Sequence, residues 1–324
     1  MRALIATSLA GLEGLAVQEV ADPVPADDEV LIDVAYCGLN FFDTLIIRGQ
    51  YQFKPEPPFS PGGELAGRIV ALGRKVSDFA VGDRVAAYVT YGACRQKIAL
   101  KPQQIVRIPD GVKDADAAGL LVTYGTSLHA LVQRGRLQPG ETLAVLGAAG
   151  GAGLAAVKIG RLLGARVIAC ASSPDKLALA REAGADDVID YTQENLRDGL
   201  RRLVGARGVD VIYDPVGGEL AEQALRAIAW KGRFLVIGFA SGVIPKMPLN
   251  LALLKGCDIS GVFWGDFAQR EPDAHAANNA RLLQWTAEGK IRDEADEIVS
   301  LDQATDAIAR IAARQAKGKI LVKM

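Results

Sequence analysis

Short apolar runs separated by turn residues fill roughly the first third of the chain. Val30 to Ala35 alternates between apolar and polar positions, and Gly67 to Leu72 and Asp83 to Val89 are further β-type runs. The stretches Asp22 to Asp28 and Lys54 to Gly63 between them are rich in Pro, Gly and Asp. This spacing predicts a small all-β barrel with irregular loops.

The pattern changes after an expected helix over 114–132, at Pro139-Gly140. Near-continuous apolar strands then alternate with helical segments. We expect strands at 142–146, 166–171, 188–191, 209–213, 233–237 and 320–323, and helices at 153–163 and 174–183. Such alternation predicts a parallel sheet covered by helices on both faces, and therefore an α/β fold.

Length and charge narrow the class of protein. At 324 residues, two domains are expected. The chain carries 37 Lys plus Arg against 38 Asp plus Glu, so no net field favours nucleic acid or an anionic membrane. We expect the partner to be a small molecule.

The four cysteines are scattered and include no C-x-x-C pair: Cys37, Cys94, Cys170 and Cys257. This argues against a disulfide framework and suits a reducing, cytoplasmic location. We expect residues 1–20 to form a first β-hairpin rather than an export signal. No run approaches the ~18 apolar residues of a membrane span.

A glycine-rich loop follows the expected strand at 142–146. It reads G-A-A-G-G-A-G and comprises Gly147, Ala148, Ala149, Gly150, Gly151, Ala152 and Gly153. Glycines let the backbone turn tightly and approach a pyrophosphate, while the next helix directs its free N–H groups at the phosphates. Strand, loop and apolar helix occur in the required order, so the loop predicts a Rossmann dinucleotide site.

The end of the next strand indicates which dinucleotide is bound. NAD-specific domains place an acidic residue here, about 20 residues past the glycines. This chain has Ser172 and Ser173, with Lys176 in the following helical turn. Two hydroxyls and a cation favour the extra phosphate of NADPH. Alternatively, Ser173 only caps the helix and Lys176 is solvated, and the two readings are compatible.

Taken together, the motifs resemble the zinc-free quinone oxidoreductase branch of the medium-chain dehydrogenase/reductase superfamily. Besides the glycine loop, they are G-L-N-F-F-D-T (38–44), R-G-Q-Y (48–51), P-G-G-E-L-A-G (61–67), V-G-D-R-V (81–85), A-S-S-P-D-K-L (171–177), E-A-G-A-D-D-V-I-D-Y (182–191) and G-K-I-L-V (318–322). The resemblance implies a GroES-like barrel domain built from 1–118 and 262–324, with a Rossmann domain at 119–261 inserted between. It also implies a homodimer paired through the Rossmann sheets.

Zinc-dependent relatives differ from this chain at two positions. They carry Cys where Asn40 stands and His where Gly63 stands, and they have a four-cysteine lobe. His129 and His275 are the only histidines, so we expect no metal. Cys37, near Asn40, is expected to be packed and inert.

The resemblance places Asn40, Asp43, Arg48 and Tyr51 in a cleft beside the nicotinamide. Asn40 would hold the carboxamide or an acceptor oxygen, and Tyr51 would donate a hydrogen bond to that oxygen. The alternative is that Asn40 and Asp43 brace the loop and Tyr51 packs as a half-buried aromatic. Thr126 resembles the family hydroxyl near the nicotinamide; alternatively it bonds the preceding helical turn.

The resemblance also implies further cofactor contacts. They are Tyr191, Val216 in the loop 214–218, the run Gly238, Phe239, Ala240 and Ser241, and Phe263, Trp264 and Lys319. Phe263 and Trp264 are alternatively core residues, and Lys319 is alternatively a solvated charge.

The activity implied is hydride transfer from NADPH to a quinone without zinc. A second reading is a reductase of α,β-unsaturated carbonyls, enoyl thioesters or 2-haloacrylates. A third is a non-enzymatic NADPH-binding structural or RNA-binding protein, against which the balanced charge and the lack of an aromatic-basic stripe count.

Overall fold

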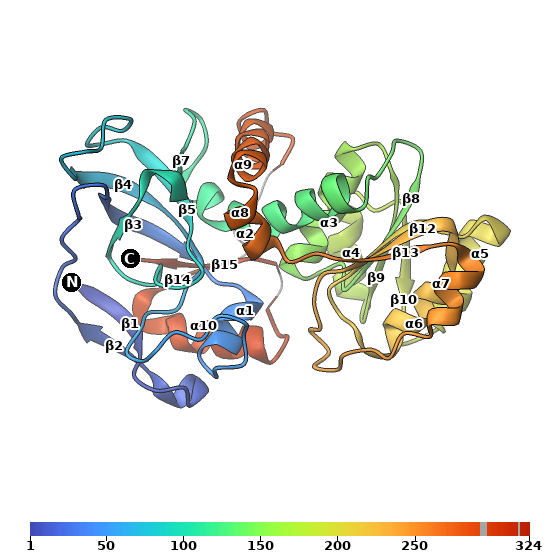
Figure 1. The fold of residues 1–324 in the computed structure, drawn as a ribbon. Coiled ribbons are helices and arrows are strands. Elements are labelled where there is room, and N and C mark those ends of the chain that lie inside the picture. The colour runs from blue at the N-terminus through green and yellow to red at the C-terminus, as the bar shows by residue number, and fades with distance from the viewer. Residues whose placement is uncertain (292–296, 317) are drawn as a thin grey trace. The chain divides into compact units, whose positions relative to one another are not determined.

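The computed structural model describes residues 1–291, 297–316 and 318–324, which divide into two compact units. The first unit comprises Met1–Val122 and Asp273–Met324, and the second comprises Thr123–Pro272 (Figure 1). The domain limits expected from the sequence, 1–118 with 262–324 against 119–261, remain a proposal.

The first unit is built on a seven-stranded sheet in which strand order differs from chain order. The order is β14-β15-β3-β4-β5-β7, with β6 also paired to β3. The strands are β3 (Val30–Gly38), β4 (Glu64–Leu72), β5 (Arg84–Tyr88), β6 (Lys97–Leu100), β7 (Ile105–Arg107), β14 (Glu297–Ser300) and β15 (Ile320–Lys323). Since β15 pairs with β3, both ends of the chain contribute to one sheet.

A separate hairpin and three helices complete this unit. The hairpin is antiparallel and consists of β1 (Arg2–Ala6) and β2 (Leu15–Glu19), as expected. The helices are α1 (Phe41–Ile46), α9 (Pro272–Ala287) and α10 (Ala304–Ala312). The core forms because β3 alternates: Val30, Ile32 and Val34 point inward and are buried.

The second unit is a parallel six-stranded sheet in the order β10-β9-β8-β11-β12-β13. Its strands are β8 (Thr142–Leu146), β9 (Arg166–Ala171), β10 (Asp187–Asp190), β11 (Val209–Asp214), β12 (Ile228–Val236) and β13 (Asp258–Gly261). The helices are α3 (Gly151–Leu162), α4 (Pro174–Glu182), α5 (Leu196–Val204), α6 (Gly218–Arg226), α7 (Leu249–Lys255) and α8 (Trp264–Arg270). Every residue of β8 is buried, which requires cover on both faces of the sheet, as the apolar pattern predicts.

Several element limits differ from the sequence expectation, and three of these differences have a clear local cause. α3 begins at Gly151 rather than 153, because its first turn is Gly-Ala and carries no apolar pattern. β12 begins at Ile228 rather than 233; its middle contains exposed Trp230 and Lys231, the latter with φ 59°, and this irregularity interrupts the pattern. α2 (Asp114–His129) ends before a π-helical turn, Ala130–Arg134, so the expected helix over 114–132 is two elements.

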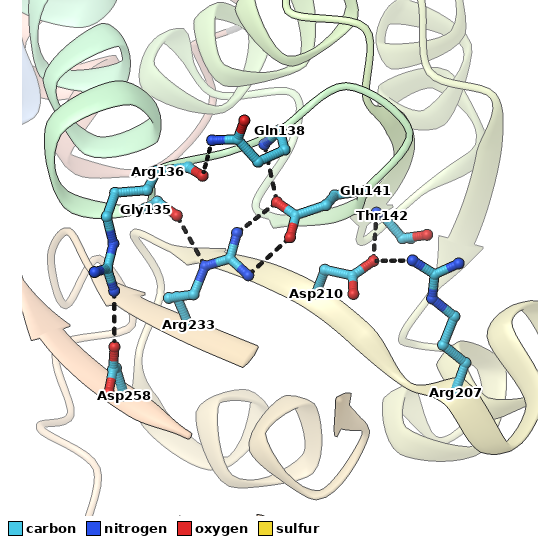
Figure 2. Close-up of polar contacts among 9 residues, drawn as sticks. All are labelled: Gly135, Arg136, Gln138, Glu141, Thr142, Arg207, Asp210, Arg233 and Asp258. Atoms are coloured by element: carbon cyan, nitrogen blue, oxygen red, sulfur yellow. Dashed lines mark hydrogen bonds and ion pairs between the residues drawn. The ribbon is translucent and has the colours of Figure 1, made fainter. Parts of the chain in front are cut away.

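The amino-terminal ends of the parallel strands are held together by charged side chains (Figure 2). Arg233 forms a bidentate ion pair with Glu141 and donates to the carbonyl oxygen of Gly135 at 2.8 Å. Asp210 accepts from the backbone N–H of Thr142 at 2.8 Å. These contacts fix the edge of the sheet opposite the glycine loop, which begins where β8 ends. Among the described residues, no helix is long and apolar enough to cross a bilayer.

Candidate active site

The glycine loop turns directly from β8 into α3. Gly147 has φ 59°, and a Cβ on Gly153 would lie 2.3 Å from the carbonyl oxygen of Gly147, so neither position accepts a side chain without strain. Gly150 precedes α3 in an extended conformation and has no side chain with which to cap it. The first N–H groups of α3 are therefore left for an external acceptor, which fits the pyrophosphate of a dinucleotide.

Two further loops meet the glycine loop at the carboxyl ends of β11 and β12. A Cβ on Gly147 would lie 2.8 Å from Cγ2 of Val216, so these two residues face each other closely. The carbonyl oxygen of Val216 accepts from the N–H of Ser241 at 2.9 Å, and that of Pro215 accepts from Ala240 at 3.0 Å. Phe239 lies against Gly217. The fold thus brings together Gly147, Val216 and the run Gly238–Ser241, at the edge of a parallel sheet where ligands bind.

Asp214 positions the β11 loop, a role that the sequence motifs did not indicate. Its Oδ1 accepts from the N–H groups of Val216 at 2.8 Å and Gly217 at 2.9 Å, and the residue is buried. Burial raises the pKa of Asp214, and the two hydrogen bonds offset part of this rise. A carboxyl group at the end of an apolar strand, followed by Pro and two Gly, is the signal that would have identified it.

The predicted phosphate-binding residues form one cluster. Ser173 caps α4, accepting from the N–H of Lys176 at 3.4 Å, so the capping interpretation is confirmed. Lys176 Nζ lies 3.2 Å from Ser172 Oγ, which shows that the ammonium turns toward the serine. The N–H of Tyr191 donates to the carbonyl oxygen of Ala171 at 3.2 Å, placing Tyr191 beside the same strand end. A cation, two hydroxyl-bearing residues and a helix N-terminus together suit a phosphate monoester.

On α2, Ser127 is buried, whereas the neighbouring Thr126 is only half-buried. Ser127 Oγ is 2.9 Å from Tyr213 Oη, and its single O–H has two acceptors within reach, the carbonyl oxygens of Thr123 at 2.9 Å and Ala152 at 3.0 Å. Within the described chain the Thr126 hydroxyl has no hydrogen-bond partner, so the expected bond to the preceding turn is wrong. Its role near the nicotinamide stays a prediction.

The two aromatic residues expected to line the cleft differ in exposure. Trp264 is buried, and its indole lies against Gly125 on α2, which favours the core interpretation. Phe263 is 43% exposed, and its contact with the cofactor stays a prediction.

In the first unit, Asn40 and Asp43 form a reciprocal cap on α1. Asp43 Oδ2 accepts from the N–H of Asn40 at 2.7 Å, and Oδ1 accepts from that of Gly62 at 3.0 Å. Asp43 is fully buried, and this burial raises its pKa to about 7, although both hydrogen bonds and the Lys319 charge lower it. Since both carboxyl oxygens bind backbone, the bracing interpretation accounts for Asp43 in this structure.

Tyr51 and Arg48 lie on the segment after α1. Tyr51 stacks on Phe42 with ring centroids 5.4 Å apart, and is half-buried. Burial raises the pKa of Tyr51 above its usual range, which makes the phenol, already protonated at neutral pH, a weaker acid. Arg48 is exposed and its side chain passes over Gly11.

Lys319 is 4% exposed, so the expectation of a solvated charge is wrong. Its ammonium forms an ion pair with Glu64 and donates to Asn40 Oδ1 at 2.8 Å. Contact with the pyrophosphate stays a prediction. Sequence reasoning passed over Glu64, although an acid opening an apolar β run after Gly-Gly is unusual.

Two family models match this chain, one over residues 26–131 and one over residues 151–279. The first is the alcohol dehydrogenase GroES-like domain model, and the second is the zinc-binding dehydrogenase model. The chain is 38% identical over 324 residues to quinone oxidoreductase-like protein 2 of Rattus norvegicus, covering 100% of this chain and 92% of that one. It is 33% identical to the quinone oxidoreductase of Pseudomonas aeruginosa, covering 96% of each. The Escherichia coli quinone oxidoreductase complexed with NADPH matches with a TM-score of 0.93, 25% identity and 100% of both chains.

A GroES-like unit joined to a Rossmann unit defines a medium-chain dehydrogenase/reductase, as expected from the sequence. Within that superfamily the chain belongs to the quinone oxidoreductase family. It is therefore an oxidoreductase.

Proposed function

We propose that this protein is an NADPH-dependent, zinc-free reductase that transfers hydride to quinones. The observation that carries the proposal lies at one edge of the second sheet. There the N-terminus of α3, which follows the glycine loop, has no side-chain cap, and Lys176 lies beside Ser172 at the end of β9. The related E. coli quinone oxidoreductase was solved with NADPH, which supports the choice of cofactor.

The residues present fit NADPH in three places. The N-terminus of α3 would hold the pyrophosphate, and Lys176 with Ser172 and Ser173 would hold the adenosine phosphate. Val216 and the run Gly238–Ser241, which the fold brings to Gly147, would lie along the nicotinamide ribose. When bound, NADPH supplies the hydride; the protein orients the acceptor and excludes water.

For the acceptor, we propose that Tyr51 supplies an orienting hydrogen bond. The phenol is protonated at neutral pH and can donate a hydrogen bond, and its raised pKa makes it a poor general acid. Stacking on Phe42 holds the ring in place. Asn40 and Asp43 would act less directly, by holding the loop that leads to Phe42.

Zinc independence is supported by what surrounds Asn40. The Lys319 ammonium lies 2.8 Å from its Oδ1, so a protein cation already occupies the neighbourhood in which zinc-dependent relatives carry a ligand. A second cation at this point would be repelled. Among the described residues, no group of three His, Cys, Asp or Glu side chains is placed to hold a metal.

The competing substrate class is an activated alkene: an α,β-unsaturated carbonyl, an enoyl thioester or a 2-haloacrylate. The same cofactor site would serve these acceptors, because only the acceptor side differs. A steady-state screen of quinones, enones, acyl thioesters and haloacrylates at constant NADPH separates them. The proposal requires turnover with quinones; turnover with alkenes alone would replace it with the second reading.

We further propose a homodimer paired through the second unit, in a cytoplasmic location. Helix α7 exposes Leu249, Leu253 and Leu254, and Trp230 is 66% exposed nearby against Gly256. Strand β13 ends the sheet, and monomers rarely leave such apolar surface beside an unpaired edge. All four cysteines are free and buried, which suits a reducing compartment. Leu253→Arg should yield a smaller species by light scattering; unchanged mass would refute this interface.

A further inference from the structure

A buried ion pair in the first unit joins Glu64, which the proposed chemistry does not use, to Lys319, which the family resemblance also places near the pyrophosphate. Glu64 is 0% exposed at the start of β4, and Lys319 is 4% exposed just before β15. Removing two charges from water is costly, and only complete hydrogen bonding offsets the cost. Glu64 meets that requirement: Oε1 accepts from Lys319 and from Asn40 Nδ2 at 3.0 Å, and Oε2 accepts from the N–H of Val122 at 2.9 Å.

The two charges fix which way the Asn40 amide points. Its Oδ1 faces the Lys319 ammonium at 2.8 Å, while its Nδ2 faces the Glu64 carboxylate at 3.0 Å. Turning the amide over would place nitrogen against the cation and oxygen against the anion. Nδ2 also donates to the carbonyl oxygen of Gly38 at 3.3 Å. The amide is therefore held by three atoms, one each from Gly38, Glu64 and Lys319.

The contacts of Asn40 are linked to Tyr51 through α1 and its residue Phe42. Asn40 caps α1 together with Asp43, and α1 carries Phe42. Phe42 lies over Gly63, where a Cβ would come within 2.2 Å of its ring, and it stacks on Tyr51 at 5.4 Å. A change in the loop at 38–43 would thus move the aromatic pair.

We propose that Glu64 and Lys319 are positioning residues for hydride transfer, setting the loop at 38–43 and, through Phe42, the orientation of Tyr51. The inference rests on the proposed function and assigns neither residue a contact with substrate. Their loss should lower kcat while the affinity for NADPH, whose predicted site is in the second unit, stays constant.

The test compares Glu64→Gln, Lys319→Met and the double variant with wild type. Each single variant leaves one buried charge without its partner, whereas the double variant removes both. We expect kcat for a quinone to fall about tenfold or more in all three, since a misplaced contact can cost about a hundredfold. The dissociation constant of NADPH, measured by fluorescence, should stay within about twofold, less than the loss of one hydrogen bond would cause. The double variant should recover thermal stability but not kcat.

A matched control is Glu141→Gln, which breaks the partly buried pair with Arg233 in the second unit (Figure 2). It should lower the melting temperature and leave kcat unchanged. Lys319→Arg keeps the charge and should fold even where the other single variants do not; it should retain stability yet turn over more slowly.

Recovery of kcat together with stability in the double variant would overturn the proposal, because the pair would then only support the fold. Weakened NADPH binding on loss of Lys319 would also overturn it and place the lysine at the pyrophosphate. Unchanged kcat in Lys319→Arg and Glu64→Gln would overturn it as well. A wild-type enzyme that does not oxidise NADPH with quinones would instead refute the proposed function.

Discussion

Replacing Lys176 with Ala should weaken NADPH binding and leave NADH binding unchanged. The ammonium lies 3.2 Å from Ser172 Oγ, beside the N-terminus of α4, where the extra phosphate of NADPH is expected. A charge-assisted hydrogen bond contributes about 1.5–3 kcal/mol, equivalent to roughly ten- to a hundredfold in affinity. Because Lys176 is only half-buried, solvent screens the contact, and we expect a loss near the lower limit.

Fluorescence titration with each cofactor at fixed ionic strength measures the effect. Lys75→Ala is a suitable control, since it removes the same charge from an exposed position in the first unit. An equal loss for NADPH and NADH would refute the reasoning, because the lysine would then bind the shared pyrophosphate or support the fold. An equal loss in Lys75→Ala would show that only net charge matters.

Four further outcomes are expected. Elemental analysis should find no stoichiometric zinc, with chelators leaving activity intact; one tightly held zinc per chain would overturn the mechanism. Tyr51→Phe should raise KM and lower kcat modestly with NADPH affinity unchanged; a loss of about 10²–10⁴-fold that also erases a titration in the pH profile would make Tyr51 a general acid. Gly153→Ala should abolish NADPH binding and lower the melting temperature, because the new Cβ would lie 2.3 Å from a carbonyl oxygen. Unchanged binding in a titration would contradict this prediction, because the loop would then shift to accommodate the methyl group. Finally, the folded state raises the pKa of Asp43 from its usual 3.8 to about 7, which favours the protonated form. Its contribution to stability is therefore full below pH about 4 and is lost as pH rises to about 7. The melting temperature of Asp43→Asn should lack that decline, and an identical pH dependence would refute the shift.

The fold could be predicted from the sequence because its periodic signals are local. Strands β8 and β9 and the terminal β15 begin and end where the apolar pattern places them. At α3 and β12 the limits differ where glycine or exposed residues carry no pattern. Pairing of β15 with β3 joins segments nearly 300 residues apart, and only the family resemblance implied it.

The site could be predicted only in part, for a related reason. The glycine loop is a local motif, and some of the residues predicted to bind the cofactor lie near Gly147 or beside Ser172, whereas Lys319 lies in the first unit. The polar contacts of Asn40 depend on Glu64 and Lys319, which are distant in sequence, so no spacing rule reveals them. The family motif indicates Thr126, but the hydroxyl that contacts Tyr213 belongs to its neighbour Ser127. Adjacent residues lie on different faces of a helix, so the motif alone does not identify which hydroxyl is buried.

The most direct test of the central claim is a single turnover of the purified enzyme with NADPH and a quinone, without added metal and with a chelator present. NADPH labelled with deuterium at the transferred position of the nicotinamide should react more slowly than unlabelled NADPH, in one phase that tracks quinone reduction. Absence of quinone reduction under these conditions, or restoration of it only by added zinc, would contradict the account.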